Sequence, residues 1–165
     1  MVMTALNETL TLLANQLKDT QYCIRGTSSL VLQSINMNID DIDILCNKET
    51  ALLANKLFKE YIVDAVSYKE SDKFKSYFGK FIINGVNVEF MGDWQIKHKD
   101  GTWSEIFDGS SFNTVIVNGT IVKVSKIEDE LKMFLLMGRF TAYQKIKKQL
   151  PSEPKEVSSA QPGLF

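Results

Sequence analysis

The segment Asp41-Ile42-Asp43-Ile44 places charged and apolar side chains on alternate residues. Because successive side chains of a β-strand point to opposite faces of the sheet, this alternation predicts a strand whose isoleucines lie in the core. Asp41 and Asp43 then share the other face, where two like charges repel and raise each other's pKa. A cation between them would relieve the repulsion, and Mg²⁺ takes such hard oxygen ligands while leaving positions open for water and phosphate oxygens. A solvated pair of carboxylates at the end of a loop is the simpler alternative.

A glycine and three hydroxyl residues, Gly26-Thr27-Ser28-Ser29, precede this strand. We expect a short strand to end at Gly26 and a helix to begin directly after it. A glycine at such a junction lets a ligand approach the backbone closely. The first turn of a helix offers N–H groups and the positive end of its dipole to a phosphate. Ser and Thr are also ordinary helix caps, so this segment alone does not establish a phosphate site.

Glu89 is a third carboxylate within an apolar strand, where it is flanked by Val88 and Phe90. An acidic residue in this setting can simply face solvent. Neighbouring strands of a sheet lie about 4.8 Å apart, so a strand paired beside Asp43 would add Glu89 to the two aspartates. A cluster of three carboxylates could hold two divalent ions about 3.5–4 Å apart for phosphoryl or nucleotidyl transfer.

The remaining segments alternate between helical and strand patterns. Helices are expected over 4–18, 28–35, 48–61, 125–138 and 140–150, and strands over 22–26, 41–46, 61–68, 75–85, 86–92 and 113–124. Asn84-Gly85 and Asn118-Gly119 predict tight hairpin turns. Ser125, followed three residues later by Glu128, predicts a capping box. This order predicts an α/β or α+β fold, with a mixed sheet backed by helices and two helices at the C-terminal end.

Length and composition indicate one domain over residues 1–150 and a flexible polar tail over 151–165. The formal net charge of -1 gives no basic field for a nucleic-acid partner. No apolar run approaches the roughly 18 residues of a membrane span. Cys23 and Cys46 lie in apolar segments without a metal-type cluster, and the single His98 excludes a mechanism that needs two histidines. We therefore expect a reduced, cytoplasmic protein.

Taken together, these segments resemble the nucleotidyltransferase superfamily that includes DNA polymerase beta. Within it they are most similar to the minimal nucleotidyltransferases and the lincosamide-type antibiotic adenylyltransferases. The family motif is Gly followed by Gly or Ser, a gap, Asp-apolar-Asp-apolar, and a third carboxylate from a later strand. Here these positions are Gly26-Thr27, Asp41-Ile42-Asp43-Ile44 and Glu89, and the resemblance extends over residues 4–149.

The resemblance implies a Mg²⁺-dependent enzyme that moves a nucleoside monophosphate from a nucleoside triphosphate, with ATP the expected donor, onto an acceptor hydroxyl. The acceptor could be a small molecule, an antibiotic or a protein. The residues implied for metal binding, in a two-ion site, and for catalysis are Asp41, Asp43 and Glu89. The residues implied for the triphosphate are Gly26, Thr27, Ser28 and Lys132. For Lys132, a solvated position on a helix face is an equally good interpretation.

Other hypotheses stay open. Thr27 stands where Gly or Ser is usual, Arg25 replaces an apolar residue, and no aspartate follows Arg139. These departures suggest a nucleotide-binding or partner-binding module with little or no catalysis, and a purely structural domain with acidic surface groups is a third interpretation. Without a large second domain, the acceptor must bind near the same cleft or be presented by a partner protein or a second copy of the chain. Gln161–Phe165 resembles the short peptides that bind bacterial sliding clamps.

Overall fold

The computed structural model describes residues 2–151, so the predicted tail and its Gln161–Phe165 segment lie outside the described residues, apart from Pro151. The elements, in chain order, are α1 (Val2–Leu17), β1 (Tyr22–Arg25), α2 (Gly26–Leu32), β2 (Ile42–Cys46), α3 (Lys48–Leu57), η1 (Lys59–Tyr61), β3 (Ile62–Glu70), β4 (Phe74–Ile83), β5 (Val86–Ile96), β6 (Phe112–Val117), β7 (Thr120–Ser125), α4 (Ile127–Leu136) and α5 (Phe140–Gln149). No helix in this part of the chain is long and apolar enough to span a membrane.

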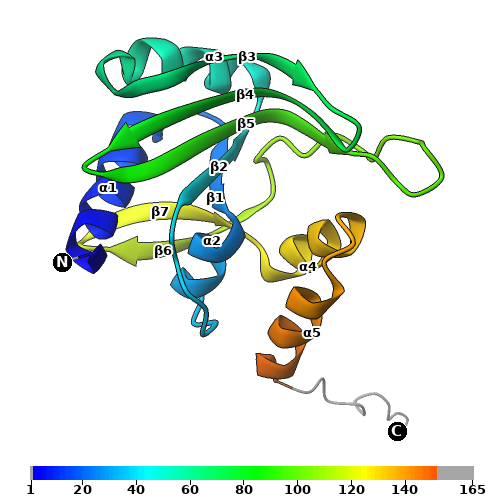
Figure 1. Cartoon of the computed structure of the whole chain (residues 1–165). Coiled ribbons are helices and arrows are strands. Elements are labelled where there is room, and N and C mark those ends of the chain that lie inside the picture. The colour runs from blue at the N-terminus through cyan, green and yellow to red at the C-terminus, as the bar shows by residue number, and fades with distance from the viewer. Residues whose placement is uncertain (1, 152–165) are drawn as a thin grey trace, which may run out of the picture.

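The strands form one seven-stranded mixed sheet in the order β3-β4-β5-β2-β1-β7-β6 (Figure 1). β2 lies at its centre, antiparallel to β1 and parallel to β5, and β1 runs parallel to β7. The remaining neighbours are antiparallel, including the β4–β5 and β6–β7 hairpins. The predicted α+β class with a mixed sheet and two closing helices is confirmed.

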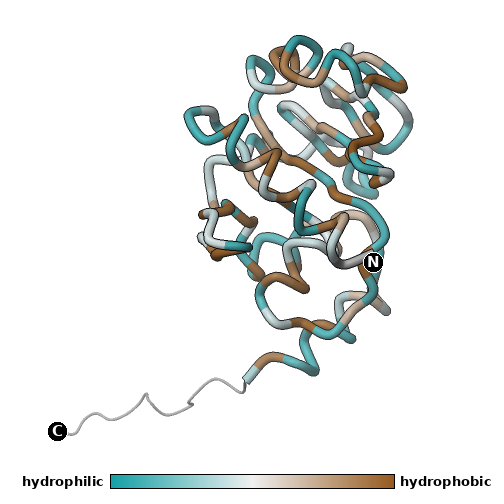
Figure 2. Tube along the Cα trace, turned by 90° about the vertical axis from the view of Figure 1, so that its left-hand side faces the viewer, coloured by the Kyte–Doolittle hydropathy of each residue, from teal (hydrophilic) through white to brown (hydrophobic). Residues whose placement is uncertain are grey.

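The main core lies between the sheet and the helices α1 and α3. Ile24, Ile44 and Phe90 are paired across β1, β2 and β5, and all three are fully buried. The alternation in β2 therefore directs its isoleucines into the core, as predicted. Hydrophobic and hydrophilic residues also alternate along much of the chain trace (Figure 2), as expected of elements with one buried and one exposed face.

A second apolar cluster covers the opposite face of the sheet, where Cys23, Leu45 and Met91 pack with Trp94 and with Met133 of α4. The buried residues of α4 and α5 also contact α2 through a third cluster. The two C-terminal helices are thus packed against the β1–β2 region from the side opposite to α1 and α3. This arrangement leaves the charged residues of β1, β2 and β5 between the sheet and α4.

Local signals in the sequence were right at the turns and wrong at one helix start. Asn84 and Asn118 have positive φ and precede glycines that also have positive φ, which is the geometry of the predicted hairpin turns. The capping box at Ser125 is not formed. Ser125 ends β7, α4 begins at Ile127, and the Ser125 hydroxyl donates to Glu130 instead of capping the helix.

Candidate active site

Strand register brings three charged residues side by side on one face of the sheet. Arg25 in β1 pairs with Asp43 in β2, and Asp43 pairs with Glu89 in the parallel strand β5. Their neighbours in sequence, such as Ile44, point into the main core, so the three charged side chains share the opposite face. The structure therefore places Glu89 next to Asp43, which periodicity alone could not do because it does not give the order of the strands.

Asp41 lies one residue before β2, where two polar contacts hold the start of the strand. The Ser28 hydroxyl donates to the Asp41 carbonyl oxygen at 2.6 Å, and the Asn87 amide donates to Asp41 Oδ1 at 3.4 Å. Ser28 is buried, so its hydroxyl joins α2 to the beginning of β2. Thr27 beside it is half-buried. Contact of either hydroxyl with a triphosphate remains a prediction.

Gly26 lies directly beside the Asp43 carboxylate. Its φ of +73° lies in the left-handed region, and an added methyl group would lie 3.1 Å from Asp43 Oδ2. A side chain at this position would therefore be both strained and crowded. The glycine lets the strand turn into α2 while its backbone stays beside the carboxylate.

The carboxylates of this face are short of compensating positive charge. Burial raises the pKa of Asp43 to about 6; Arg25 opposes this shift, while Glu89 and Asp41 add to it. Burial also raises the pKa of Glu89, with Lys80 and Arg25 acting in the opposite direction. Both carboxylates are thus held in a setting that disfavours their charged forms and would be relieved by a cation.

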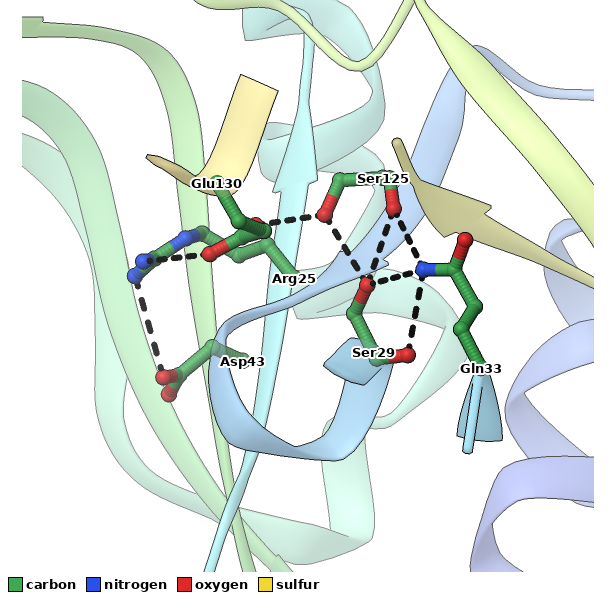
Figure 3. A network of polar contacts seen from close by, with 6 residues as sticks. All are labelled: Arg25, Ser29, Gln33, Asp43, Ser125 and Glu130. Carbon is green, nitrogen blue, oxygen red and sulfur yellow. Dashed lines mark hydrogen bonds and ion pairs between the residues drawn. The ribbon is translucent and has the colours of Figure 1, made fainter. Parts of the chain in front are cut away.

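Arg25 is the cation that contacts this cluster (Figure 3). Its side chain is 6% exposed, its Nη1 lies 3.9 Å from Asp43 Oδ2, and its Nη2 donates to Glu130 Oε1 at 3.2 Å. The guanidinium carbon also lies 4.8 Å from the centre of the Trp94 ring, within the range of a cation–π contact. The side chain is therefore held on three sides.

Glu130 is fully buried and connects Arg25 to a network of hydroxyl and amide groups. The Ser125 hydroxyl donates to Glu130 Oε2 at 2.5 Å and lies 3.0 Å from the Ser29 hydroxyl. The Gln33 amide donates to Ser29 Oγ and to the Ser125 carbonyl oxygen. The ion pair is thus tied to α2, β7 and α4 together.

The motifs of the sequence did not indicate a role in the site for Arg25 or Glu130. A signal for Glu130 does exist, because it lies three residues after Ile127 and four before Phe134, two residues that pack in the cluster between α2, α4 and α5. A glutamate on the apolar side of an amphipathic helix requires a buried partner. Nothing local identified Arg25 as that partner, since the two residues are 105 positions apart.

The donor chemistry of the cluster suits Mg²⁺, but its geometry is not that of a ready-made metal site. Asp41, Asp43 and Glu89 offer the hard oxygen ligands that this ion prefers. Within residues 2–151, however, no group of three His, Cys, Asp or Glu side chains is arranged to hold a metal ion. Asp43 Oδ2 faces both Gly26 and the Arg25 guanidinium. A bound ion would therefore need further ligands from a nucleotide or from water.

A large cavity of about 1380 Å³ opens beside Glu89 and Arg25. Trp94 lies on its wall, together with other side chains of β4 and β5. The lining also includes residues 69–73 around the β3–β4 turn, residues 97–100 after β5, and the turn between α4 and α5, which contains Arg139. The cavity gives a substrate direct access to the Glu89 carboxylate.

Lys132 lies away from this cavity. It forms an exposed ion pair with Glu105, and its ammonium group is 5.9 Å from the ring of Phe107. Together with Glu105 and Phe107 it lines a separate, smaller cavity of about 170 Å³. The structure thus gives Lys132 a partner on the surface, and its predicted contact with a triphosphate stays a prediction.

Comparison with known proteins gives structural neighbours that are described as nucleotidyltransferases or adenylyltransferases. A candidate nucleotidyltransferase from Thermotoga maritima is 29% identical over 86% of this chain and 89% of its own, with a TM-score of 0.74. A lincosamide antibiotic adenylyltransferase with bound lincomycin is 13% identical over 89% of this chain and 97% of its own, with a TM-score of 0.53. ANT(2″)-Ia, in complex with adenylyl-2″-tobramycin, is 15% identical over 94% of both chains, with a TM-score of 0.51.

No protein-family model matches the chain, and a search of curated proteins finds no match. The two adenylyltransferases share the fold, and the Thermotoga protein is similar in sequence as well. The resemblance to the nucleotidyltransferase superfamily that the sequence indicated is confirmed.

Proposed function

We propose that this chain, which has the nucleotidyltransferase fold, transfers a nucleoside monophosphate from a nucleoside triphosphate, with ATP the favoured donor, onto a hydroxyl group of an acceptor. One observation carries the proposal. Strand register brings Asp43 and Glu89 together beside the left-handed Gly26, with Asp41 one residue before β2. This is the combination of a glycine turn and three carboxylates that the resemblance implies for nucleotidyl transfer.

The residues of the site are proposed to have two roles, metal binding and triphosphate binding. Asp41, Asp43 and Glu89 would hold Mg²⁺. When bound, the ion would polarise the phosphoryl oxygens and balance charge that develops during the transfer. The backbone at Gly26, which has no side chain in the way, would lie against the triphosphate, with Thr27 and Ser28 beside it.

Glu89 is proposed as the general base. Its carboxylate lines the large cavity, where it would meet the acceptor hydroxyl. The acceptor oxygen would attack the α-phosphorus, its proton would pass to Glu89, and the bond between the α-phosphorus and the bridging oxygen would break. Pyrophosphate would leave with the electron pair of that bond. The cavity beside Glu89 is proposed to hold the acceptor, and its size admits a small molecule, an antibiotic or a segment of a partner protein.

The alternative is a catalytically weak or inactive module that binds a nucleotide or a partner. Arg25 favours it, because this guanidinium contacts the carboxylate on which a metal ion would depend. Both hypotheses predict a nucleotide site. They differ in whether pyrophosphate is released.

A thermal unfolding experiment tests the nucleotide site. The wild type is melted with and without Mg²⁺ and each nucleoside triphosphate, beside Asp43→Asn and the control Asp40→Asn, an exposed neighbour of the site. A ligand at about 100 times its Kd stabilises by about 2.7 kcal/mol, or roughly 5–10 °C for a chain of this size. The proposal expects a metal-dependent shift that Asp43→Asn loses and Asp40→Asn keeps. No shift with any nucleotide would contradict it.

A further inference from the structure

Arg25 occupies a position where a positive charge is difficult to remove. Glu130 has no exposed surface, so its charge requires the guanidinium as a partner. Trp94 lies against the guanidinium, and Nε has no hydrogen-bond partner among the described residues that could draw the side chain elsewhere. The guanidinium is therefore a fixed part of the site and not a surface group that could swing away.

The same guanidinium lies beside the carboxylate that is proposed to bind the metal ion. Asp43 Oδ2 is 3.9 Å from Arg25 Nη1 and faces Gly26, where the triphosphate is proposed to bind. An ion bound to this oxygen would be a close neighbour of the guanidinium, and two positive charges at such a distance repel strongly in a partly buried site. Arg25 and a divalent ion thus compete for one carboxylate.

We propose that Arg25 is a resident cation that keeps the affinity of Asp43 for a free divalent ion low, so that the ion binds tightly only together with the triphosphate. The inference rests on the proposed function. The negative charge of the triphosphate offsets the repulsion between the ion and the guanidinium, and its oxygens supply the ligands that the three carboxylates do not complete. Metal and nucleotide binding are then coupled, and each raises the affinity for the other by the same factor.

The test measures Mn²⁺ binding by calorimetry, with and without the non-reacting analogue α,β-methylene-ATP. The main variant is Arg25→Met with Glu130→Gln, which removes the buried pair together and leaves the net charge unchanged. Glu130→Gln alone leaves Asp43 as the one carboxylate in an ion pair with Arg25 among the described residues. Arg25→Lys keeps the positive charge and controls for loss of the guanidinium shape. Near-UV circular dichroism checks that each variant is folded.

The two Glu130 variants are expected to change in opposite directions. Without nucleotide, the double variant should bind Mn²⁺ at least about fivefold tighter than the wild type, and Glu130→Gln should bind it weaker, because like charges close together in a partly buried site repel strongly. Arg25→Lys should stay within about threefold of the wild type, because it retains the charge. The analogue should also improve Mn²⁺ binding by a smaller factor in the double variant than in the wild type.

The possible failures can be told apart. If the wild type binds Mn²⁺ with the analogue but the double variant is unchanged or weaker without it, the competition by Arg25 is wrong and the proposed function stands. If both Glu130 variants change in the same direction, the ion pair has only a structural role and the inference is overturned. If no variant binds Mn²⁺ even with the analogue, the proposed function and the inference both fall.

Discussion

Replacing Asp43 by asparagine is expected to stabilise the ligand-free protein at neutral pH. The Asp43 carboxylate is charged in a setting that favours its neutral form, because it is largely buried and has Asp41 and Glu89 nearby. Asparagine has nearly the same shape and carries no charge. The carboxylate proposed to hold the metal ion thereby costs the ligand-free protein part of its stability.

The expected size follows from the pKa. A rise from 3.8 to about 6 corresponds to about 3 kcal/mol at about 1.4 kcal/mol per pKa unit, and we take about 2 kcal/mol because the side chain is 27% exposed. The folded state binds the proton more tightly than the unfolded chain. The stability that proton binding at Asp43 adds is therefore complete below about pH 3.8 and is lost as the pH rises through about 6.

Urea unfolding between pH 5 and pH 8 measures the effect. At pH 8 the free energy of unfolding of Asp43→Asn should exceed that of the wild type by about 2 kcal/mol, and this excess should shrink by about 1 kcal/mol at pH 5, where the wild-type carboxyl is largely protonated. The exposed neighbour Asp40→Asn should show neither effect. Parallel pH profiles for wild type and Asp43→Asn would refute the argument that burial and like charges act on this carboxylate.

Three further changes test other parts of the site. Glu89→Gln should retain part of the nucleotide-dependent thermal shift, because Asp41 and Asp43 remain to hold the ion, but lower pyrophosphate release by about 10²–10⁴-fold, since it removes the proposed base; equal release would exclude that role. Gly26→Ala should lower the free energy of unfolding in urea by about 1–2 kcal/mol, because alanine at positive φ is strained and its methyl group crowds Asp43; an unchanged midpoint would mean that the turn adapts. Glu130→Gln should lower the free energy of unfolding by about 3 kcal/mol, because it leaves the buried Arg25 charge without its partner. The double variant Arg25→Met with Glu130→Gln should recover most of this loss, because it removes both charges. Equal destabilisation of the single and the double variant would show that the ion pair itself is stabilising.

Prediction from the sequence succeeded where the physical cause is local. The alternation around Ile42 and Asp43 fixed the strand and its two faces, and Asn84-Gly85 fixed a hairpin turn, because each depends only on adjacent residues. The predicted capping box at Ser125 is wrong because interactions with residues outside the local segment determine the position of Ser125. Ser125 continues β7 into the sheet, and its hydroxyl serves the buried Glu130.

Local sequence patterns could not predict which residues meet in the site, because that depends on the order of the strands and on contacts between distant segments. Glu89 lies beside Asp43 because β5 runs parallel to β2 at the centre of the sheet, and only the family resemblance indicated that these strands meet. The Arg25–Glu130 pair joins the first strand to the fourth helix. Glu130 could have been recognised as a buried charge from its place on an apolar helix face, whereas its partner could not.

The segments that line the large cavity differ in how readily they tolerate substitution. Glu89 and Arg25 lie on central strands, where a substitution disturbs neighbours on both sides, whereas other lining residues come from the loop at 97–100 and the turn between α4 and α5. Connecting segments tolerate substitution and insertion far better than the strands they join. If the cavity holds the acceptor as proposed, a lineage with this fold can exchange one acceptor for another by altering these two segments, while the proposed reacting groups are inherited unchanged.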